Sequence, residues 1–268
     1  MSARPTLNVL WMYPSILNLY GDRGNLMALR WVGEQAGVDV TVRRVEHLDD
    51  KADLGWADLI VFNPGELALM PDVITAVMGQ RAAIGNYASQ GKVIFATGTS
   101  GALLAKRTAR RSGSNFPGLG LLDMVMTERE TPLGDDLITR IDDLGDDIVG
   151  NQIQMVDASL GDGQTPFGRV VYGYGNAGAG TADGAISRGV VFTNHLGPVL
   201  VKNPWLTLWL IRRALPEAAS HLPAPDDPQM RSTWNLERDS SAAILRFTTA
   251  KEKPSYATHA GNQSRRDR

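Results

Sequence analysis

The chain has 268 residues, of which 43% are apolar and 21% charged, as in ordinary globular proteins. Its net charge of −2 gives no general attraction for nucleic acid or anionic membranes, and no apolar run approaches the roughly 20 residues of a membrane span. The complete absence of cysteine excludes disulfides, thiolate metal sites and thiol nucleophiles. The N-terminal sequence MSARPTLNVLWMYPS lacks the long apolar segment of a signal peptide, so a cytoplasmic protein is expected.

The first hundred residues alternate between short apolar runs and longer amphipathic segments, with Gly-rich turns between them. Apolar runs predict strands at residues 7–14, 38–45, 57–66 and 91–98, and helical patterns lie at residues 25–37 and 72–90. Strands that alternate with helices are typical of a mostly parallel, doubly wound sheet. The sequence therefore predicts an α/β protein.

The pattern changes after residue 108. Shorter strands with turn signals predict a more antiparallel second half of the same domain, followed by a strand and loop at 189–204 and a helix at 205–215. The segment 216–268 begins Pro- and Ala-rich and ends polar and basic. We expect one domain over residues 6–215 and a partly disordered C-terminal extension over residues 216–268, with one short helix in STWNLERDSSAAILRF.

The stretch VIFATGTSGALLAKR, residues 93–107, predicts a buried strand, a tight turn and the start of a helix, with Thr97 at the bend. In many α/β enzymes a nucleophile stands at such a junction. A threonine hydroxyl is far less acidic than a thiol and needs a positioned base, and its methyl group crowds the turn. Thr97 is therefore read as a structural residue at a helix start, with a nucleophilic role as the alternative.

Four segments together resemble one family: YPSILNLYGDRGN, FPGLGLLD, VVYGYGN and FTNHLGPVLVKNP. They are similar to the CobB/CobQ-like class I glutamine amidotransferases, and most of all to the GatD-like glutaminase subunits. The resemblance covers residues 6–215. It implies a three-layer, flavodoxin-like α/β fold with a mostly parallel central sheet.

The resemblance also implies a chemistry. In the family, a cysteine at the strand–helix bend attacks the side-chain amide of glutamine, and a histidine acts as its base. The ammonia passes to a partner, a MurT-like Mur ligase, which uses ATP to amidate the D-glutamate of the peptidoglycan precursor lipid II. Glutamine is thus the family substrate, and no cofactor or metal is implied for this subunit.

Two catalytic positions depart from the family pattern. The family's Cys-Gly-Gly-Tyr-Gln corresponds to the segment that begins at Thr97, so threonine stands at the nucleophile position. The family's histidine directly precedes Gly-Pro, where this chain has Leu196, and His195 lies one residue earlier. Because adjacent side chains of an extended segment face opposite sides, His195 is expected to face the site only if a loop absorbs the shift.

The substrate-binding positions depart as well. A run of three glycines that supports the oxyanion in the family corresponds to NPGE at residues 63–66, where Pro64 removes an N–H donor. The arginine that binds the glutamine carboxylate aligns with Thr131. The substrate-binding positions implied by the resemblance are Asn63, Gly65, Gly98 and Thr131.

Three hypotheses follow: a GatD-like subunit of a ligase complex with impaired or lost glutaminase activity, a non-catalytic binding or regulatory module, and a hydrolase of changed chemistry that uses Thr97 or Ser100 with His195. The four histidines have no metal-ligand spacing, so no metal site is expected. Trp205 and Trp209 lie four residues apart on one predicted helix face. They are read as core residues, with a partner-binding role as the alternative.

Overall fold

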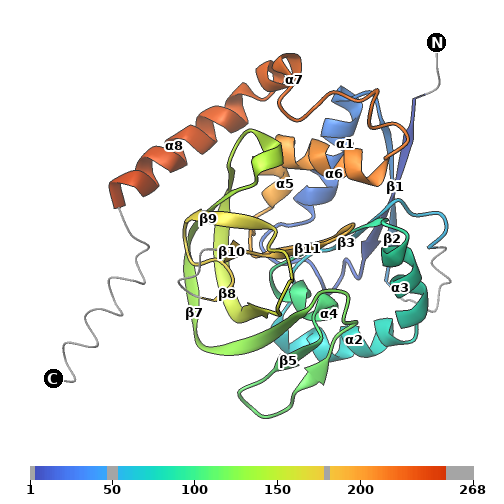
Figure 1. Cartoon of the computed structure of the whole chain (residues 1–268), viewed down its shortest axis with the longest axis vertical. Helices are drawn as coiled ribbons and strands as arrows, with labels where there is room; N and C mark the ends of the chain where they lie inside the picture. Colours follow the sequence, from blue (N-terminus) through green and yellow to red (C-terminus); the bar gives the residue numbers. More distant parts are fainter. Residues whose placement is uncertain (1–3, 47–53, 178–181, 252–268) are drawn as a thin grey trace.

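The computed structural model describes residues 4–46, 54–177 and 182–251. Its centre is a six-stranded sheet in the order β11-β12-β4-β3-β1-β2 (Figure 1). Every neighbouring pair is parallel except the edge strand β11. The strands are β1 (Thr6–Met12), β2 (Asp39–Val45), β3 (Leu59–Phe62), β4 (Val93–Thr97), β11 (Ala185–Ser187) and β12 (Val190–Thr193).

Helices cover both faces of this sheet, which is why its inner strands are continuous apolar runs. One face packs on α1 (Gly24–Gln35) and α6 (Pro204–Ala214), and the other on α2 (Met70–Met78), α3 (Arg81–Ser89) and α4 (Gly101–Leu104). Alternate residues of β4 point to opposite faces of the sheet. Val93 and Phe95 lie on the face covered by α1 and α6, and Ile94 and Ala96 on the face covered by α2, α3 and α4. The expected three-layer α/β fold is confirmed.

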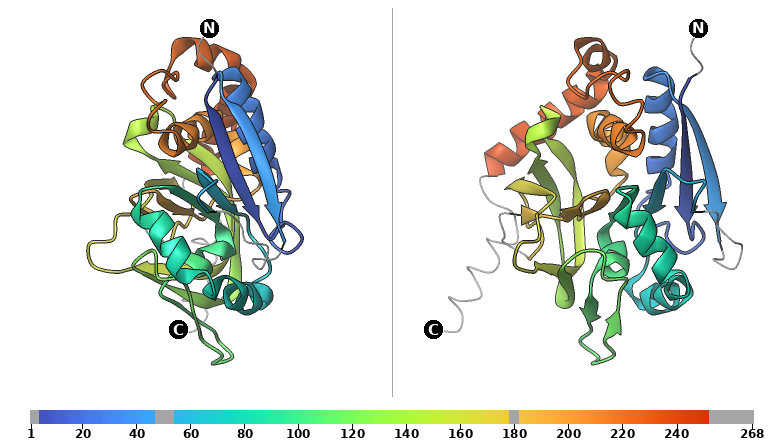
Figure 2. Two further views of the ribbon diagram at one scale, coloured as in Figure 1. Left: turned by 90° about the vertical axis from the view of Figure 1, so that its right-hand side faces the viewer. Right: turned by 45° about the vertical axis from the view of Figure 1, so that its right-hand side comes forward.

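A second sheet is mostly antiparallel and packs beside the first (Figure 2). Its two long strands, β7 (Met124–Arg140) and β8 (Ile148–Leu160), pair with each other, with a bulge between Glu128 and Leu133. The shorter strands are β5 (Arg107–Ala109), β6 (Phe116–Pro117), β9 (Gly168–Tyr172) and β10 (Ala182–Asp183). The remaining short elements are η1 (Leu67–Leu69), η2 (Gly98–Ser100), η3 (Asp142–Leu144) and α5 (Val199–Lys202).

The helical pattern at residues 72–90 forms two helices instead of the expected one. The chain turns between Met78 and Arg81, and the two segments are bent by 83°. Gly79 supplies the break, since glycine weakens a helix interior. Within the described ranges, no single helix has the length and apolarity to cross a membrane; only this bent pair meets those two criteria when counted together.

The C-terminal extension packs on the domain as far as Lys251. It forms α7 (Pro228–Thr233), whose first turn is capped by the Asp227 side chain, and α8 (Asn235–Lys251). Trp234 between them is fully buried, and its Nε1 donates to Gln35 Oε1 of α1 at 2.9 Å. The extension is thus anchored to the first helix, while residues 252–268, for which disorder was expected, lie outside the described residues.

Trp205 and Trp209 belong to the core beneath α1. Trp205 is 1% exposed, and the ring of Trp209 contacts Phe167 edge-on at 6.0 Å between centroids. The core interpretation of this pair is confirmed, and the alternative that they form a partner-binding face is wrong, because both side chains are buried.

Candidate functional site

Functional groups gather where the parallel strands end. Strands β1, β3, β4 and β12 run in the same direction, so their carboxyl ends share one edge of the central sheet. In open α/β sheets this edge is where ligands bind. The loops that follow these strands carry Asp22, Asn63, Gly98 and His195, which brings the sequence motifs of residues 20–25, 63–66, 97–101 and 192–204 together.

The tight turn after β4 lies one residue later than expected. Thr97 is the last residue of the strand, has ordinary extended dihedrals (φ −124°, ψ 145°) and is fully buried. The left-handed residue is Gly98, at φ +56°. A sharp, strained strand-to-helix turn is the geometry that exposes a nucleophile in α/β enzymes, and here glycine holds it. Within the described part of the chain, Thr97 Oγ1 has no hydrogen-bond partner.

Leu196 lies over this turn. A Cβ atom built on Gly98 would be 2.8 Å from Leu196 Cδ2 and 3.3 Å from Pro64 Cβ. The backbone of Leu196 forms an antiparallel bridge with Asn151 of β8, so the segment is extended there. The side chain at position 196 therefore faces Gly98 and makes the surroundings of the turn apolar.

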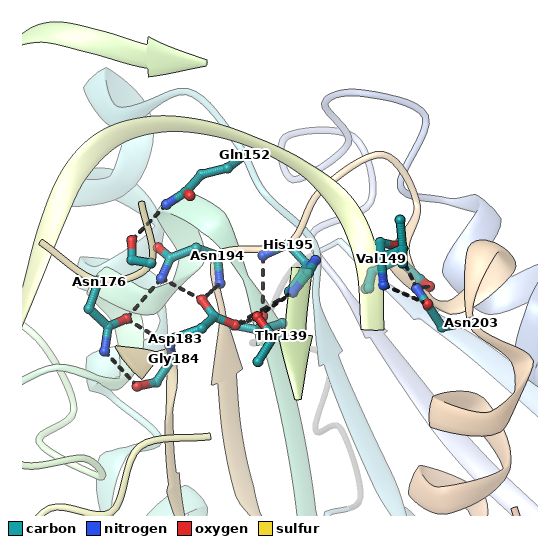
Figure 3. Close-up of polar contacts among 12 residues, drawn as sticks. Thr139, Val149, Gln152, Asn176, Asp183, Gly184, Asn194, His195 and Asn203 are labelled. Atoms are coloured by element: carbon teal, nitrogen blue, oxygen red, sulfur yellow. Dashed lines mark hydrogen bonds and ion pairs between the residues drawn. The ribbon is translucent and has the colours of Figure 1, made fainter. Parts of the chain in front are cut away.

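His195 points toward Thr139 and Asp183 (Figure 3), which agrees with the alternation of side chains in an extended segment. Its Nε2 is 2.8 Å from Thr139 Oγ1 and 3.8 Å from Asp183 Oδ2, and the ring is fully buried. Burial lowers the pKa of His195 to about 4, with Lys202 lowering it further and Asp183 opposing the shift. The imidazole is neutral at neutral pH, so its contact with Asp183 is not an ion pair. No hydrogen bond joins His195 to Thr97 in the described chain.

Asp183 is the centre of a buried polar network that the sequence did not predict (Figure 3). Its carboxylate accepts hydrogen bonds from Thr193 Oγ1 at 2.6 Å and from the backbone and side-chain nitrogens of Asn194. Asn194 also donates to Asn176 Oδ1, and Asn176 is bonded in both directions to the backbone of Gly184. These contacts fix the loop that ends in His195. The three residues Asn176, Asp183 and Asn194 follow or belong to strands of two different sheets, β9 and β10 in one and β12 in the other, so the sequence alone does not reveal the cluster.

The loop at residues 63–66 has no free donor at Gly65. Thr99 Oγ1 accepts the Gly65 N–H at 3.1 Å and donates to the Gly65 carbonyl at 2.6 Å. Ser100 Oγ donates to the Asn63 carbonyl at 2.6 Å, and both side chains are buried. Pro64 has no N–H to offer. The hydroxyl groups at the turn therefore have structural roles. Thr99 and Ser100 bond to the backbone of the neighbouring loop, and Thr97 is buried.

Thr131 lies in the bulge of β7 and is exposed. Its carbonyl accepts a hydrogen bond from Arg129 Nε at 3.2 Å. The Arg129 guanidinium in turn contacts both carboxylate oxygens of Asp157 at 2.6 Å. The arginine nearest to the predicted carboxylate-binding position is therefore already paired with a carboxylate of the chain itself.

The space in front of the turn is nearly filled. A cavity of about 10 Å³, room for about one water molecule, is lined by Gly98, Thr99, Asn194 and residues 152–156 of β8. Gln152 and Gln154 occupy this region and bond to each other and to the carbonyls of Gly175 and Asn176. Ligand pockets usually measure at least about 300 Å³. The turn therefore has no substrate-sized space in this structure.

A second buried cluster lies beside the turn, toward α1. Asn25 Nδ2 donates to Asp22 Oδ1 at 3.3 Å and to Asn63 Oδ1 at 3.2 Å, and Asn25 Oδ1 accepts the N–H of Leu200 at 3.0 Å. Burial raises the pKa of Asp22 to about 7, against the opposing effects of Asn25, the Gly197 backbone and Lys202. This cluster ties three loops of the sheet edge together. Among the residues described, no group of three or more His, Asp or Glu is placed to hold a metal ion.

Comparison with known proteins points to one family. No family model matches the chain. The GatD subunit of the glutamine-hydrolysing lipid II isoglutaminyl synthase of Streptococcus pneumoniae is 28% identical over 225 residues, covering 82% of this chain and 86% of that subunit. The corresponding subunit of Staphylococcus aureus is 25% identical over 203 residues, covering 74% and 80%.

Solved structures agree on the fold. A glutamine amidotransferase superposes with a TM-score of 0.52 at 16% identity and covers 76% of this chain and 98% of its own. PurLQS from Thermotoga maritima gives 0.51 at 17% identity, covering 81% and 98%. The chain is thus similar in sequence to GatD subunits and shares the fold of glutamine amidotransferases.

Proposed function

We propose that this chain is the GatD-like subunit of a lipid II isoglutaminyl synthase, that it binds a MurT-like ligase subunit, and that it does not hydrolyse glutamine. The role in amidating the peptidoglycan precursor is supported by the two GatD relatives, each named as one subunit of such a synthase. We assign it to residues 6–215, with residues 216–268 as an extension. The ATP that a ligase consumes puts the complex in the cytoplasm.

One observation carries the loss of glutaminase activity: Leu196 faces Gly98. Position 196 precedes Gly197-Pro198, where the family has its base, and its side chain reaches the Cβ position of residue 98. In a working pair the base contacts the nucleophile. The partner of position 196 is Gly98, so we infer that Gly98, and not Thr97, occupies the nucleophile position. In this assignment the nucleophile position is occupied by glycine and the base position by leucine, and neither side chain can perform the step.

The surroundings support the same inference. An oxyanion needs free donors, whereas the Gly65 N–H is bonded to Thr99 and Pro64 has none. A substrate carboxylate needs a free cation, whereas Arg129 is paired with Asp157. Glutamine needs room, whereas the cavity at Gly98 is about 10 Å³. Nothing comparable favours a hydrolase that uses Thr97 or Ser100 with His195, because the Ser100 hydroxyl is bonded to Asn63 and His195 to Thr139.

The role left to the chain is non-catalytic: it shapes the ligase or controls the use of free ammonia. The purified chain is mixed with the ligase subunit of the same organism, ATP and lipid II, and supplied with either glutamine or ammonium. We expect amidation with ammonium and none with glutamine. Ammonia release from glutamine that disappears in Thr97→Ala or Ser100→Ala would overturn the proposal.

The assignment of Gly98 can be tested by thiol chemistry, since the chain has no cysteine to give a background. In Gly98→Cys/Leu196→His, a neighbouring imidazole is expected to lower the thiol pKa and speed alkylation by iodoacetamide. The matched variant Thr97→Cys/Leu196→His places the thiol at a fully buried site and should react slowly. Equal reactivity of the two variants contradicts the assignment.

A further inference from the structure

Several exposed large apolar side chains come from α1, the loop before it and α5. The described residues include eleven such side chains, and five of them come from the loop before α1, from α1 itself and from α5: Ile16, Tyr20, Met27, Trp31 and Val201. Single exposed apolar residues are normal on a globular protein, whereas a cluster marks an interaction site. Met27 is 66% exposed and Trp31 is 41% exposed, which leaves much of both side chains in water.

Three of these residues, Met27, Trp31 and Val201, come from the adjoining helices α1 and α5. Met27 and Trp31 are four apart on α1 and therefore lie on the same side of the helix. At its first turn α1 packs closely on α5, because a Cβ built on Gly24 would be 2.7 Å from Pro198 Cγ and 3.3 Å from Val201 Cγ2. Figure 1 shows the two helices side by side. We call Tyr20, Arg23, Met27, Arg30, Trp31 and Val201 the α1–α5 surface.

Two arginines flank Met27 on this surface, and the exposed carboxylate of Glu34 lies one turn beyond them on α1. Arg23 and Arg30 are exposed, and neither forms an ion pair with the described residues. Both lie on the Met27 side of α1, three or four positions from it. Tyrosine, tryptophan, methionine and arginine are the residue types enriched in protein interfaces. A partner that fits offers an apolar centre and an acidic rim.

The surface is built from the same loops as the buried cluster beside the turn. Asn25 joins Asp22 of the loop before α1, Asn63 after β3 and the Leu200 N–H of α5. Tyr20 precedes Asp22 in the LYGDRGN segment, and Val201 belongs to GPVLVKNP. The buried asparagine therefore fixes how α1 and α5 present their outer side chains, in a part of the molecule where the turn itself has no catalytic groups.

We propose that the α1–α5 surface is where this chain binds the ligase subunit, through a face of that subunit with an apolar centre and an acidic rim. The inference rests on the proposed function, which supplies the partner. In this proposal the family-like segments LYGDRGN and GPVLVKNP serve to bind the partner and to position the surface residues. It also replaces Trp205 and Trp209, which are buried, with Trp31 as the aromatic contact.

The test uses the full chain and the Mur-ligase-like protein of the same organism, with binding measured by calorimetry. Met27→Glu and Trp31→Glu change exposed side chains, so the fold is retained. Phe247→Glu is the matched control, because Phe247 is 60% exposed and belongs to the C-terminal half of α8, which leads away from α1 (Figure 1). We expect each surface variant to weaken binding about 10-fold or more, as for central interface residues, and the control to bind like the wild type.

The results distinguish failure of the proposed docking surface from failure of the proposed complex. If the wild type binds the ligase and both surface variants bind equally well, the surface assignment is wrong and the proposed complex stands. If the wild type does not bind, the complex and the docking surface both fail. Concentration-dependent dimerisation that Trp31→Glu abolishes would make a second copy of this chain the occupant, and it would also overturn the assignment to the ligase.

Discussion

Two neighbouring parts of one sheet edge have opposite characters. The turn after β4 is surrounded by glycine, leucine and proline, and the hydroxyls of Thr99 and Ser100 bond to the backbone. A few residues away, Asp22, Asn25 and Asn63 form a connected polar cluster beneath a surface rich in exposed aromatic and basic side chains. The first part resembles a protein interior, and the second resembles a binding site.

The difference shows which interactions the fold itself needs. Gly98, Leu196 and Pro64 pack against one another, so the turn is stable without a nucleophile or a base. The Asn25 cluster joins loops after β1 and β3 to α5, and its loss would separate them. Catalytic groups can be replaced by apolar ones at little cost in stability, whereas buried asparagines that bridge loops cannot.

The strongest perturbation removes the support under α1. Trp234→Ala leaves a large cavity beside α1, so we expect a loss of about 3–5 kcal/mol in the free energy of unfolding. Binding of the ligase subunit should weaken as well, since Gln35 loses its partner and α1 carries the proposed surface. Urea denaturation measures the first effect. Trp234→Phe keeps most of the volume and should cost about 1–2 kcal/mol, chiefly through the lost hydrogen bond; equal losses in both variants would contradict this account.

A second test concerns pH. The folded pKa of Asp22, about 7, lies above its ordinary value of 3.8. The contribution of Asp22 to the free energy of unfolding is therefore fully present below about pH 4, and it is lost as the pH rises through 7. At pH 8, Asp22→Asn should be more stable than the wild type by up to about 4 kcal/mol, at 1.36 kcal/mol per pKa unit. At pH 4 the two should be alike.

His195 acts in the opposite direction over part of this range. Its folded pKa, about 4, lies below the ordinary 6.5, so its contribution is present above 6.5 and is lost as the pH falls through 4. Because His195 is present in both proteins, its effect cancels when Asp22→Asn and the wild type are compared at the same pH. Thermal unfolding at each pH measures this difference in stability. A difference that does not change between pH 4 and 8 would show that Asp22 is ionised throughout.

A smaller effect is expected at the turn. Gly98→Ala puts a Cβ at φ +56° and close to Leu196, which should cost about 1–3 kcal/mol in stability. Adding Leu196→Ala should remove part of that cost, since the two side chains meet. Gly79→Ala is the matched control, because a Cβ there meets nothing within 4 Å. Strictly additive changes at 98 and 196 would mean that the two positions do not face each other.

The smallest effect concerns Thr97. Its hydroxyl is buried without a hydrogen-bond partner in the described chain, so Thr97→Val should stabilise the protein by about 1 kcal/mol. Thr99→Val, by contrast, removes two contacts with Gly65 and should destabilise it. Chemical denaturation of the two variants measures both changes in the free energy of unfolding, an increase for Thr97→Val and a decrease for Thr99→Val. A Thr97→Val variant that is clearly less stable would assign the hydroxyl a structural partner.

The sequence predicted the fold well because the parallel sheet depends on local pattern. The alternation of apolar runs and amphipathic segments gave the order of strands and helices, and the period of two placed His195 and Leu196 on opposite sides. The turn was misplaced by one residue, since the run VIFATG does not reveal whether the strand ends before Thr97 or includes it. Element ends are the least certain part of such an interpretation.

Contacts between distant segments could not be predicted. Asn176, Asp183 and Asn194 meet only because the strands around them pair, and no spacing in the sequence relates them. The pairing of Arg129 with Asp157 is of the same kind, since it depends on the register of β7 and β8. The extension was expected to be polar and loose, yet one tryptophan within it is fully buried.

The position of Trp31 has an optical consequence. The chain has six tryptophans, and Trp31 is the exposed one, whereas the other five are buried or partly buried. An indole in water emits at longer wavelengths than one in a protein interior and is open to quenching by iodide. A protein that covers α1 would shift this emission to the blue and shield it from the quencher. The chain thus carries its own fluorescent reporter at the surface proposed for docking, and no label has to be attached.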